Sequence, residues 1–171
     1  NNTIYVLPPI ARFTYTPNCG NRINFTFTDN SIVNPLLIPL SWQWDFGDAT
    51  TSVLQNPVHN YPALGDYIVR LIVNNGGCAD TTYQTVHAVD EAPDFVANQT
   101  TACKVATITF NAVNLIFTNI ISYKWDFGDA TPPVIVTVPV IPHTYNNAGN
   151  YTVRLITTDI NGCTDTITKA N

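Results

Sequence analysis

Methionine is absent from this 171-residue sequence, and charged residues make up only 11% of it. Lysine and arginine together number seven, against twelve aspartates and glutamates, which gives a formal net charge of −5. The few cations are scattered singly and form no basic cluster of the kind that contacts phosphates or anionic lipids. The composition therefore argues against nucleic acid as a partner.

Long apolar runs are missing as well. A membrane-spanning helix needs about 20 consecutive apolar residues, and the most apolar candidate, residues 134–141, is interrupted by Pro139. We therefore expect no membrane insertion. Hydrophobic residues nevertheless form 45% of the chain, which is too many for a disordered segment. Because the sequence starts without methionine or a basic stretch, we expect a slice of a longer protein, with no signal peptide.

The sequence does contain a repeat. The pentapeptide Trp-Asp-Phe-Gly-Asp occurs at 44–48 and again at 125–129. Alternation along an extended strand puts its Trp and Phe on the inner face and its first Asp on the outer face. Gly then permits an unusual backbone angle, and the second Asp can close a turn. The ten residues are Trp44, Asp45, Phe46, Gly47 and Asp48, with Trp125, Asp126, Phe127, Gly128 and Asp129.

The similarity continues downstream of each pentapeptide, where one histidine, two tyrosines and one arginine recur in the same order. The two sets lie 84 residues apart at all four positions, which indicates a tandem duplication. They are His59, Tyr61, Tyr67 and Arg70 in the first copy, and His143, Tyr145, Tyr151 and Arg154 in the second.

Together, Trp-Asp-Phe-Gly-Asp, a Pro-x-His-x-Tyr segment and Gly-x-Tyr-x-Val-x-Leu resemble the polycystic kidney disease (PKD) domain. The resemblance covers most of both repeats. Two departures lie in loops and leave the expected fold unchanged. Ala49 and Ala130 stand where the family commonly has a second glycine, and no residue separates Pro142 from His143 in the second copy.

Short alternating strands, separated by Gly, Pro, Asn and Asp and lacking a helical period, also predict an all-β fold. We expect two tandem immunoglobulin-like (PKD) β-sandwiches, residues 9–89 and 90–171. Residues 1–8 are expected to form a strand, either the end of a preceding repeat or an addition to the first domain. Asp90 and Glu91 are expected to keep the short linker between the domains solvated.

The four cysteines fall two per repeat at matching positions. Three pairings are open to four cysteines. The duplication favours Cys19–Cys78 and Cys103–Cys163, because each domain is expected to close its own bridge. A zinc site is the competing interpretation, but no Cys-x-x-Cys pair is present. Disulfides would imply export to an oxidising compartment.

The paired aspartates invite an acid/base or calcium interpretation. Their spacing at a strand end does not by itself make a catalytic pair. We expect the first aspartate of each pentapeptide to form a cross-strand ion pair, Asp45–Arg70 and Asp126–Arg154, and the second to cap the turn. No cofactor is predicted. Calcium is kept as an alternative only because PKD-like modules of some secreted proteases bind it.

The histidines lack a serine or cysteine nucleophile at a recognisable spacing. We expect His59 and His143 to pack on a neighbouring side chain and to bond loop backbone. Tyr67 and Tyr151 are expected to tie down a loop through their hydroxyls, as in a tyrosine corner. The sequence thus predicts no catalytic residue and no metal ligand.

The leading functional hypothesis is a non-catalytic structural or adhesive module, a semi-rigid spacer or binding repeat in a large cell-surface or secreted bacterial protein. Its partners would be other repeats of the same protein, with surface polysaccharide or protein as further ligands. The low charge and the Asn-Gly-Cys-Thr-Asp ending resemble repeats of large surface proteins in bacteria that glide or use type IX secretion. The alternative is an accessory carbohydrate- or protein-binding module of a secreted hydrolase.

Overall fold

Strands form where large and polar side chains alternate. In β6 (Gly65–Asn74), Val69, Leu71 and Val73 are fully buried, and the residues between them are less so.

The computed structural model describes residues 9–33 and 40–170. The predicted strand at residues 1–8 lies outside the described residues. The chain divides into two units, Asn1–Val89 and Asp90–Asn171.

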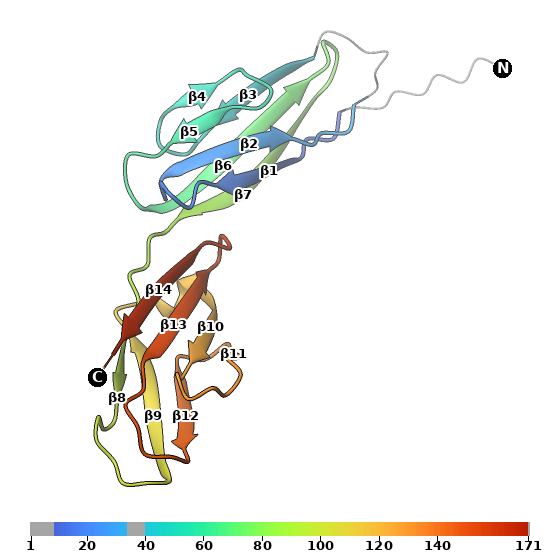
Figure 1. The fold of residues 1–171 in the computed structure, drawn as a ribbon. Coiled ribbons are helices and arrows are strands. Elements are labelled where there is room, and N and C mark those ends of the chain that lie inside the picture. Colours follow the sequence, from blue (N-terminus) through green and yellow to red (C-terminus); the bar gives the residue numbers. More distant parts are fainter. Residues whose placement is uncertain (1–8, 34–39, 171) are drawn as a thin grey trace, which may run out of the picture. The chain divides into compact units, whose positions relative to one another are not determined.

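The first unit is a sandwich of two antiparallel sheets that lie face to face (Figure 1). The smaller sheet has the order β1-β2-β5 and the larger sheet the order β4-β3-β6-β7. The remaining bounds are β1 (Phe13–Pro17), β2 (Asn24–Asp29), β3 (Ser41–Asp45), β4 (Thr51–Ser52), β5 (Val58–Asn60) and β7 (Ala79–Ala88).

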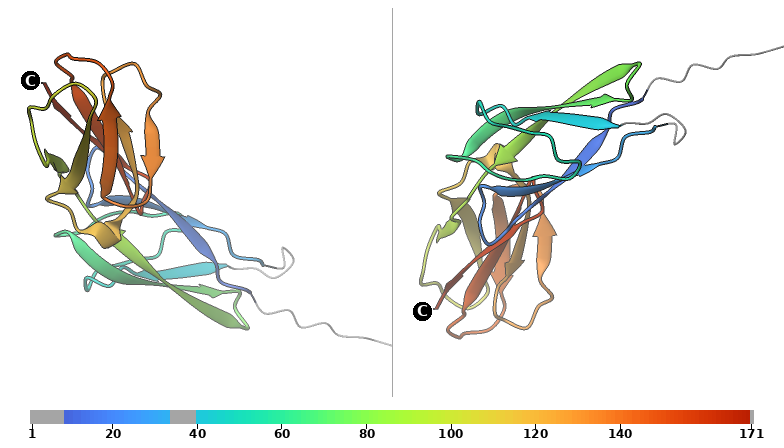
Figure 2. Two further views of the ribbon diagram at one scale, coloured as in Figure 1. Left: turned by 90° about the horizontal axis from the view of Figure 1, so that it is seen from below. Right: turned by 90° about the horizontal axis from the view of Figure 1, so that it is seen from above.

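The second unit repeats this topology, with sheets β12-β9-β8 and β11-β10-β13-β14. Figure 2 shows its two layers from further directions. A single 3-10 turn, η1 (Phe117–Asn119), connects β9 to β10. The strands are β8 (Asp94–Ala97), β9 (Ala106–Val113), β10 (Ile120–Asp126), β11 (Val134–Val136), β12 (Val140–Tyr145), β13 (Val153–Asp159) and β14 (Thr164–Lys169).

The all-β prediction is confirmed, since the described residues form strands and no α-helix. The edge strand β4 has only two residues and ends at Ser52. β5 and β12 are both sheet edges that carry the histidine, and β12 also contains Pro142, which suits an edge because it cannot donate to a ladder.

Each unit has its own aromatic core, built around the tryptophan of the pentapeptide. Trp44 is 1% exposed and meets the ring of Phe13 edge-on, with centroids 5.1 Å apart. Trp125 is fully buried and meets Phe95 in the same way at 5.4 Å. The same core therefore forms twice from residues at matching positions.

The predicted disulfide pairs are wrong. The thiols of Cys78 and Cys103 are free, whereas Cys19 and Cys163 are disulfide-bonded. Each predicted pair would have joined a bonded cysteine to a free one. The cysteines occupy equivalent positions in the two repeats, but this does not bring the two cysteines of one repeat close together.

The course of the strands explains the error. β1 runs beside β7 in the same direction, as two hydrogen bonds show. Gln84 Nε2 donates to Phe13 O at 2.6 Å and, farther along both strands, Tyr15 Oη donates to Thr85 O at 3.4 Å. Cys78 precedes β7 and Cys19 follows β1. The two cysteines therefore lie at opposite ends of the sandwich, too far apart for the Cα separation of about 6 Å that a disulfide needs.

The second unit has the same sheet order. Lys169 of β14 donates from Nζ to Phe95 O of β8 at 2.7 Å, at the place where Gln84 donates to Phe13 O in the first unit. Cys163 precedes β14 and Cys103 follows β8. These cysteines too are separated by the length of the sheet.

The linker also differs from expectation. Glu91 was expected to be solvated, but it is only 6% exposed. Its carboxylate accepts hydrogen bonds from Ile116 N at 2.9 Å and from Asn119 Nδ2 at 2.7 Å. This end of the linker is therefore bonded to the segment that connects β9 and β10.

Candidate functional site

The candidate site of each unit is the turn that follows the buried tryptophan strand. Gly47 has φ +81°, and a Cβ at this position would lie 2.7 Å from Ile68 O. Gly128 is equivalent, with φ +74° and Thr152 O against the place of its Cβ. Both the backbone angle and the close approach of the neighbouring strand therefore require glycine here.

Two residues farther on, the turn takes a second left-handed step, now at alanine. Ala49 has φ +69° and Ala130 has φ +65°. These are the positions where the sequence departs from the glycine common in similar domains. The turn keeps its shape despite the missing glycine, at a backbone cost of about 1–2 kcal/mol for each alanine.

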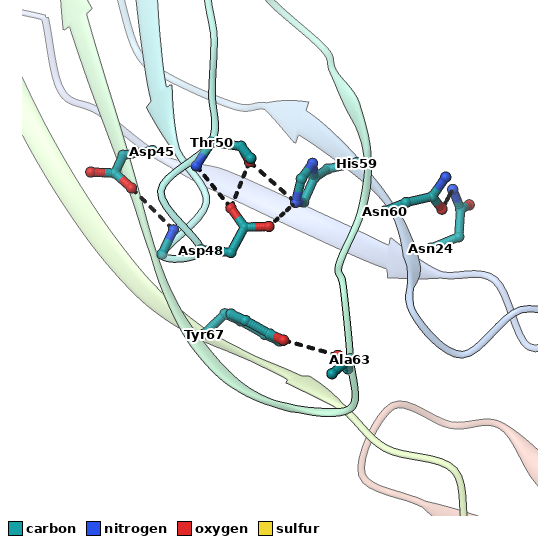
Figure 3. Close-up of polar contacts among 9 residues, drawn as sticks. Asn24, Asp45, Asp48, Thr50, His59, Asn60, Ala63 and Tyr67 are labelled. Carbon is teal, nitrogen blue, oxygen red and sulfur yellow. Dashed lines mark hydrogen bonds and ion pairs between the residues drawn. The ribbon is translucent and has the colours of Figure 1, made fainter.

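The second aspartate of the turn bonds the histidine of the facing sheet. Asp48 Oδ2 lies 2.7 Å from His59 Nε2, and Asp48 Oδ1 accepts from Thr50 N at 3.1 Å and from the Thr50 hydroxyl. Figure 3 shows the three side chains pointing toward one another. Because β3 and β5 belong to different sheets, this cluster fastens one sheet to the other.

The histidine ring is also stacked. The centroid of the His59 ring lies 4.1 Å from that of the Phe46 ring, at an interplanar angle of 4°. The second unit repeats both contacts, with His143 Nε2 at 2.8 Å from Asp129 Oδ2 and its ring 3.9 Å from that of Phe127. We call these two sets the His–Asp clusters: Asp48, Thr50, His59 and Phe46, and Asp129, Thr131, His143 and Phe127.

The aspartate of each cluster is held as an anion. Burial by itself raises the pKa of Asp48, but the hydrogen bonds from Thr50 and His59 outweigh it and leave the pKa below its usual value. The pKa of Asp129 is lowered by the same balance, with bonds from Thr131 and His143. An ionised carboxylate only accepts hydrogen bonds, so the histidine Nε2 carries the hydrogen in each cluster.

A catalytic triad would need a different geometry. A triad histidine faces its aspartate with one ring nitrogen and its nucleophile with the other. Here Asp48 and the Thr50 hydroxyl both lie at Nε2 of His59, at 2.7 and 3.5 Å, and the hydroxyl donates to the aspartate. The cluster therefore has no nitrogen placed to take a proton from the threonine.

The tyrosines continue the aromatic stack away from the histidine. The ring of Tyr61 meets His59 edge-on at 4.7 Å and stacks on Tyr67 at 3.9 Å. The Tyr67 hydroxyl donates to Ala63 O at 2.9 Å, as expected of a tyrosine corner. Tyr151 donates to Asn147 O at 2.8 Å in the second unit.

The tyrosine that follows the histidine differs between the units. Burial raises the pKa of Tyr145 to about 12, and its hydroxyl donates to Phe127 O at 3.1 Å. Burial also raises the pKa of Tyr61, but its hydroxyl has no hydrogen-bond partner among the described residues.

The expected cross-strand ion pairs are formed. Asp45 and Arg70 face each other across β3 and β6, with Nη2 3.3 Å from Oδ2, and Asp126 and Arg154 do so at 3.2 Å. All four side chains are between 33% and 47% exposed. At this exposure each pair stabilises its unit by no more than about 1 kcal/mol.

The bond between aspartate and histidine was not predicted from the sequence. Asp48 was predicted to cap the turn, which the bond from Thr50 N confirms, whereas His59 was predicted to bond loop backbone and bonds Asp48 instead. The two residues are 11 positions apart in the first repeat, and their counterparts are 14 apart in the second. Their recurrence in both repeats was the only available signal.

The described residues contain no group of three or more His, Cys, Asp or Glu side chains that could hold a metal ion. No helix in the same part of the chain is long and apolar enough to cross a membrane. The polar groups of the His–Asp clusters are engaged within their own unit. The arrangement is suited to holding two sheets together.

The paired sheets, their aromatic cores and the repeated turn place the chain in the class of tandem immunoglobulin-like β-sandwich modules. Residues 6–89 and 90–171 each match the PKD domain family, and the chain belongs to that family. The fibronectin(III)-like modules of Clostridium thermocellum CbhA share the fold, with a TM-score of 0.50 at 14% identity over 85% of this chain and 83% of theirs. The predicted fold class and family are thus confirmed.

Two curated proteins contain similar sequence. Polycystin-1 of Homo sapiens is 30% identical over 109 residues, which cover 63% of this chain and 2% of polycystin-1. Collagenase ColA of Bacillus cereus is 39% identical over 54 residues, which cover 32% of this chain and 6% of the collagenase. The chain therefore spans a small fraction of either relative. PKD domains are non-catalytic modules typical of extracellular or secreted proteins.

Proposed function

We propose that this chain is a pair of spacer or adhesive repeats in a large exported protein of a bacterial surface. The observation that carries the proposal is the duplicated His–Asp cluster. The histidine and aspartate that resemble part of a catalytic site bond each other and so hold together the two sheets of each unit. Such a module supplies shape and stability, and its partners would be other repeats of the same protein.

Further support comes from the composition and the family. The chain is only 11% charged, and PKD domains are typical of extracellular or secreted proteins. The bacterial source, with gliding motility or type IX secretion as the setting, rests on the resemblance of the Asn-Gly-Cys-Thr-Asp ending to repeats of such surface proteins.

Small-angle X-ray scattering on the 171-residue chain tests the spacer role. A spacer extends, so the maximum dimension should be close to twice that of one sandwich, and it should change little between low and high salt because few charges are present. A maximum dimension close to that of a single sandwich would contradict the proposal.

The second candidate is an accessory module of a secreted hydrolase. It is favoured by the similarity to collagenase ColA, which is 39% identical over 54 residues. Cosedimentation with insoluble collagen and with insoluble polysaccharides distinguishes the two candidates. Saturable binding to collagen favours the accessory module, saturable binding to polysaccharide alone is compatible with an adhesive repeat, and the absence of binding to both at concentrations up to about 1 mM favours the spacer.

A further inference from the structure

The second unit contains a cavity of about 530 Å³. It lies at the end of the sandwich where β8 ends and β9 and β13 begin, and residues of both sheets line it. The volume falls within the range of about 300–1,000 Å³ typical of small-molecule sites. Its walls include Phe95, Phe110 and Tyr151, with Lys169 at the β14 side.

The first unit shows why this space exists. Tyr15 faces Phe27 across β1 and β2, and Ala97 faces Phe110 across β8 and β9. Phe27 and Phe110 are themselves equivalent, since each packs on the tryptophan of its unit. Ala97 therefore occupies the place of Tyr15, and a whole phenol ring is missing from the second unit.

Two neighbouring positions are also smaller. Phe25 faces His59 in the first unit, and Ile108 faces His143 in the second. Ala106 faces Tyr145 in the second unit. It takes the place of Ile23, whose carbonyl accepts a hydrogen bond from Tyr61 N in the first unit. Ala97, Ala106 and Ile108 all line the cavity. Its volume therefore results from three reductions in side-chain size at one place.

In the first unit the same place is filled by an aromatic ring. The Tyr15 ring lies 5.9 Å from that of Phe25, edge-on, and 6.3 Å from that of Phe27. Its hydroxyl reaches Thr85 O of β7 at 3.4 Å. The space between these walls thus accommodates a phenol ring with its oxygen toward the last strand.

We propose that the cavity of the second unit binds a para-substituted phenol, the chemical group that Tyr15 supplies in the first unit. Phe95, Phe110 and Tyr151 offer ring edges and faces, which favour an aromatic guest over an aliphatic one. This binding site is independent of the spacer role, since it lies within one unit and uses none of the His–Asp cluster.

Lys169 supplies the polar contact that the phenol oxygen needs. An ammonium group has three donors, and Nζ donates to Phe95 O at 2.7 Å and pairs with Asp94 Oδ1 at 2.6 Å. The third donor remains for a ligand oxygen at the β14 side. The carboxylate and carbonyl hold the cation in place before the ligand arrives.

A phenol ring could be part of a small molecule or of a tyrosine side chain in a peptide. Titration of the 171-residue chain with p-cresol tests the first source, and N-acetyl-tyrosinamide tests the second. Toluene is the control ligand, because it differs from p-cresol only in lacking the hydroxyl group. We expect saturable binding of at least one phenol, with NMR shifts confined to the cavity residues, and about tenfold weaker binding of toluene because the bond to Lys169 is lost.

The first unit provides matched variants. Ala97→Tyr restores the missing ring and should weaken phenol binding by about tenfold or more while raising the melting temperature of the second unit. Tyr15→Ala empties the equivalent place and should create an additional phenol site in the first unit. If Ala97→Tyr fails to fold, Ile108→Phe fills the cavity from the other wall with the residue found at position 25.

Absence of saturable binding by both phenols to the wild-type chain would overturn the proposal. Unchanged affinity in a folded Ala97→Tyr or Ile108→Phe chain would also overturn it, because the phenol would then bind elsewhere. Equal affinity for toluene and p-cresol would contradict the role of Lys169 and reduce the site to a non-specific apolar cavity.

Discussion

At the scale of the residue, each histidine has two roles. His59 packs its ring on Phe46 and donates to an aspartate whose side chain is only 3% exposed. Both roles are local, yet they join strands of different sheets. Burying an ionised carboxylate is costly unless its oxygens are bonded, so the cluster is stable only as a complete set.

We predict that His59→Phe destabilises the first unit by about 1–3 kcal/mol, because the ring stacking is kept but Asp48 loses a charge-assisted bond. Calorimetry should show one lowered transition. His87→Phe is the matched control, since His87 also bonds an aspartate, Asp66, at 2.8 Å, but the Asp66 side chain is 68% exposed. The control should change stability little, and an equal effect of both variants would contradict the role assigned to burial.

The lowered pKa values of Asp48 and Asp129 predict acid sensitivity. A carboxyl whose pKa is lower in the folded state stabilises the fold above its unfolded pKa, about 4, and this stability is lost as the pH falls through the folded pKa. Both calorimetric transitions should therefore fall as the pH decreases below about 4. Asp48→Asn should flatten this dependence in the first unit alone.

Some acid dependence should remain in that variant, because the pKa of Asp29 is also lowered. Burial by itself raises it, and hydrogen bonds that include those from Ser31, Gln55 and Trp42 outweigh the burial. A first transition that is as acid-sensitive in Asp48→Asn as in the wild type would show that Asp48 is not the responsible group.

At the scale of the element, the turn after β3 combines a glycine that is required with an alanine that is strained. We predict opposite effects in one turn. Gly47→Ala should destabilise the first unit by more than about 2 kcal/mol, because it adds backbone strain and a contact with Ile68 O. Ala49→Gly should stabilise it by up to about 1 kcal/mol, because the left-handed angle is then unstrained.

Chemical denaturation with urea measures both changes. Gly162→Ala in the second unit separates the angle from the contact, because Gly162 has a similar backbone angle, φ +83°, with no atom within 4 Å of the added Cβ. If Gly47→Ala destabilised its unit no more than Gly162→Ala destabilises the second unit, the contact with Ile68 O would be unimportant.

The elements also show what the sequence can and cannot predict. Strands such as β6 and β13 follow from alternation, since burial on one face determines which residues must be apolar. β5 has only three residues and β12 contains a proline, so neither carries that pattern. Their histidines were recognised as a repeat but not as partners of an aspartate, because that bond joins two sheets.

The cysteine error has a related cause. Matching positions revealed the duplication correctly, but pairing depends on which end of the sandwich each cysteine occupies. That information lies in the parallel course of β1 and β7, which are the first and last strands of the unit. Contacts between elements so far apart in the chain leave no local pattern.

At the scale of the whole molecule, two separate cores predict two separate unfolding events. We expect Trp44→Ala to destabilise only the first unit and Trp125→Ala only the second. Each variant should lower the free energy of unfolding of its unit by about 3–5 kcal/mol, as large core truncations do. Calorimetry of both variants beside the wild type is the measurement. Loss of both transitions in either variant would show a single cooperative molecule.

The replacement of Tyr15 by Ala97 has a consequence for how such repeats diversify. A duplicated domain can acquire a ligand by subtraction, because removing one ring from one copy leaves a cavity already shaped for that ring while the other copy remains whole. One residue per repeat, at the position of Tyr15 and Ala97, would then indicate which repeats of an array bind a ligand. An aromatic residue there would fill the cavity, and a small residue would leave it open. Diversity along the array would need no new loop and no new polar group.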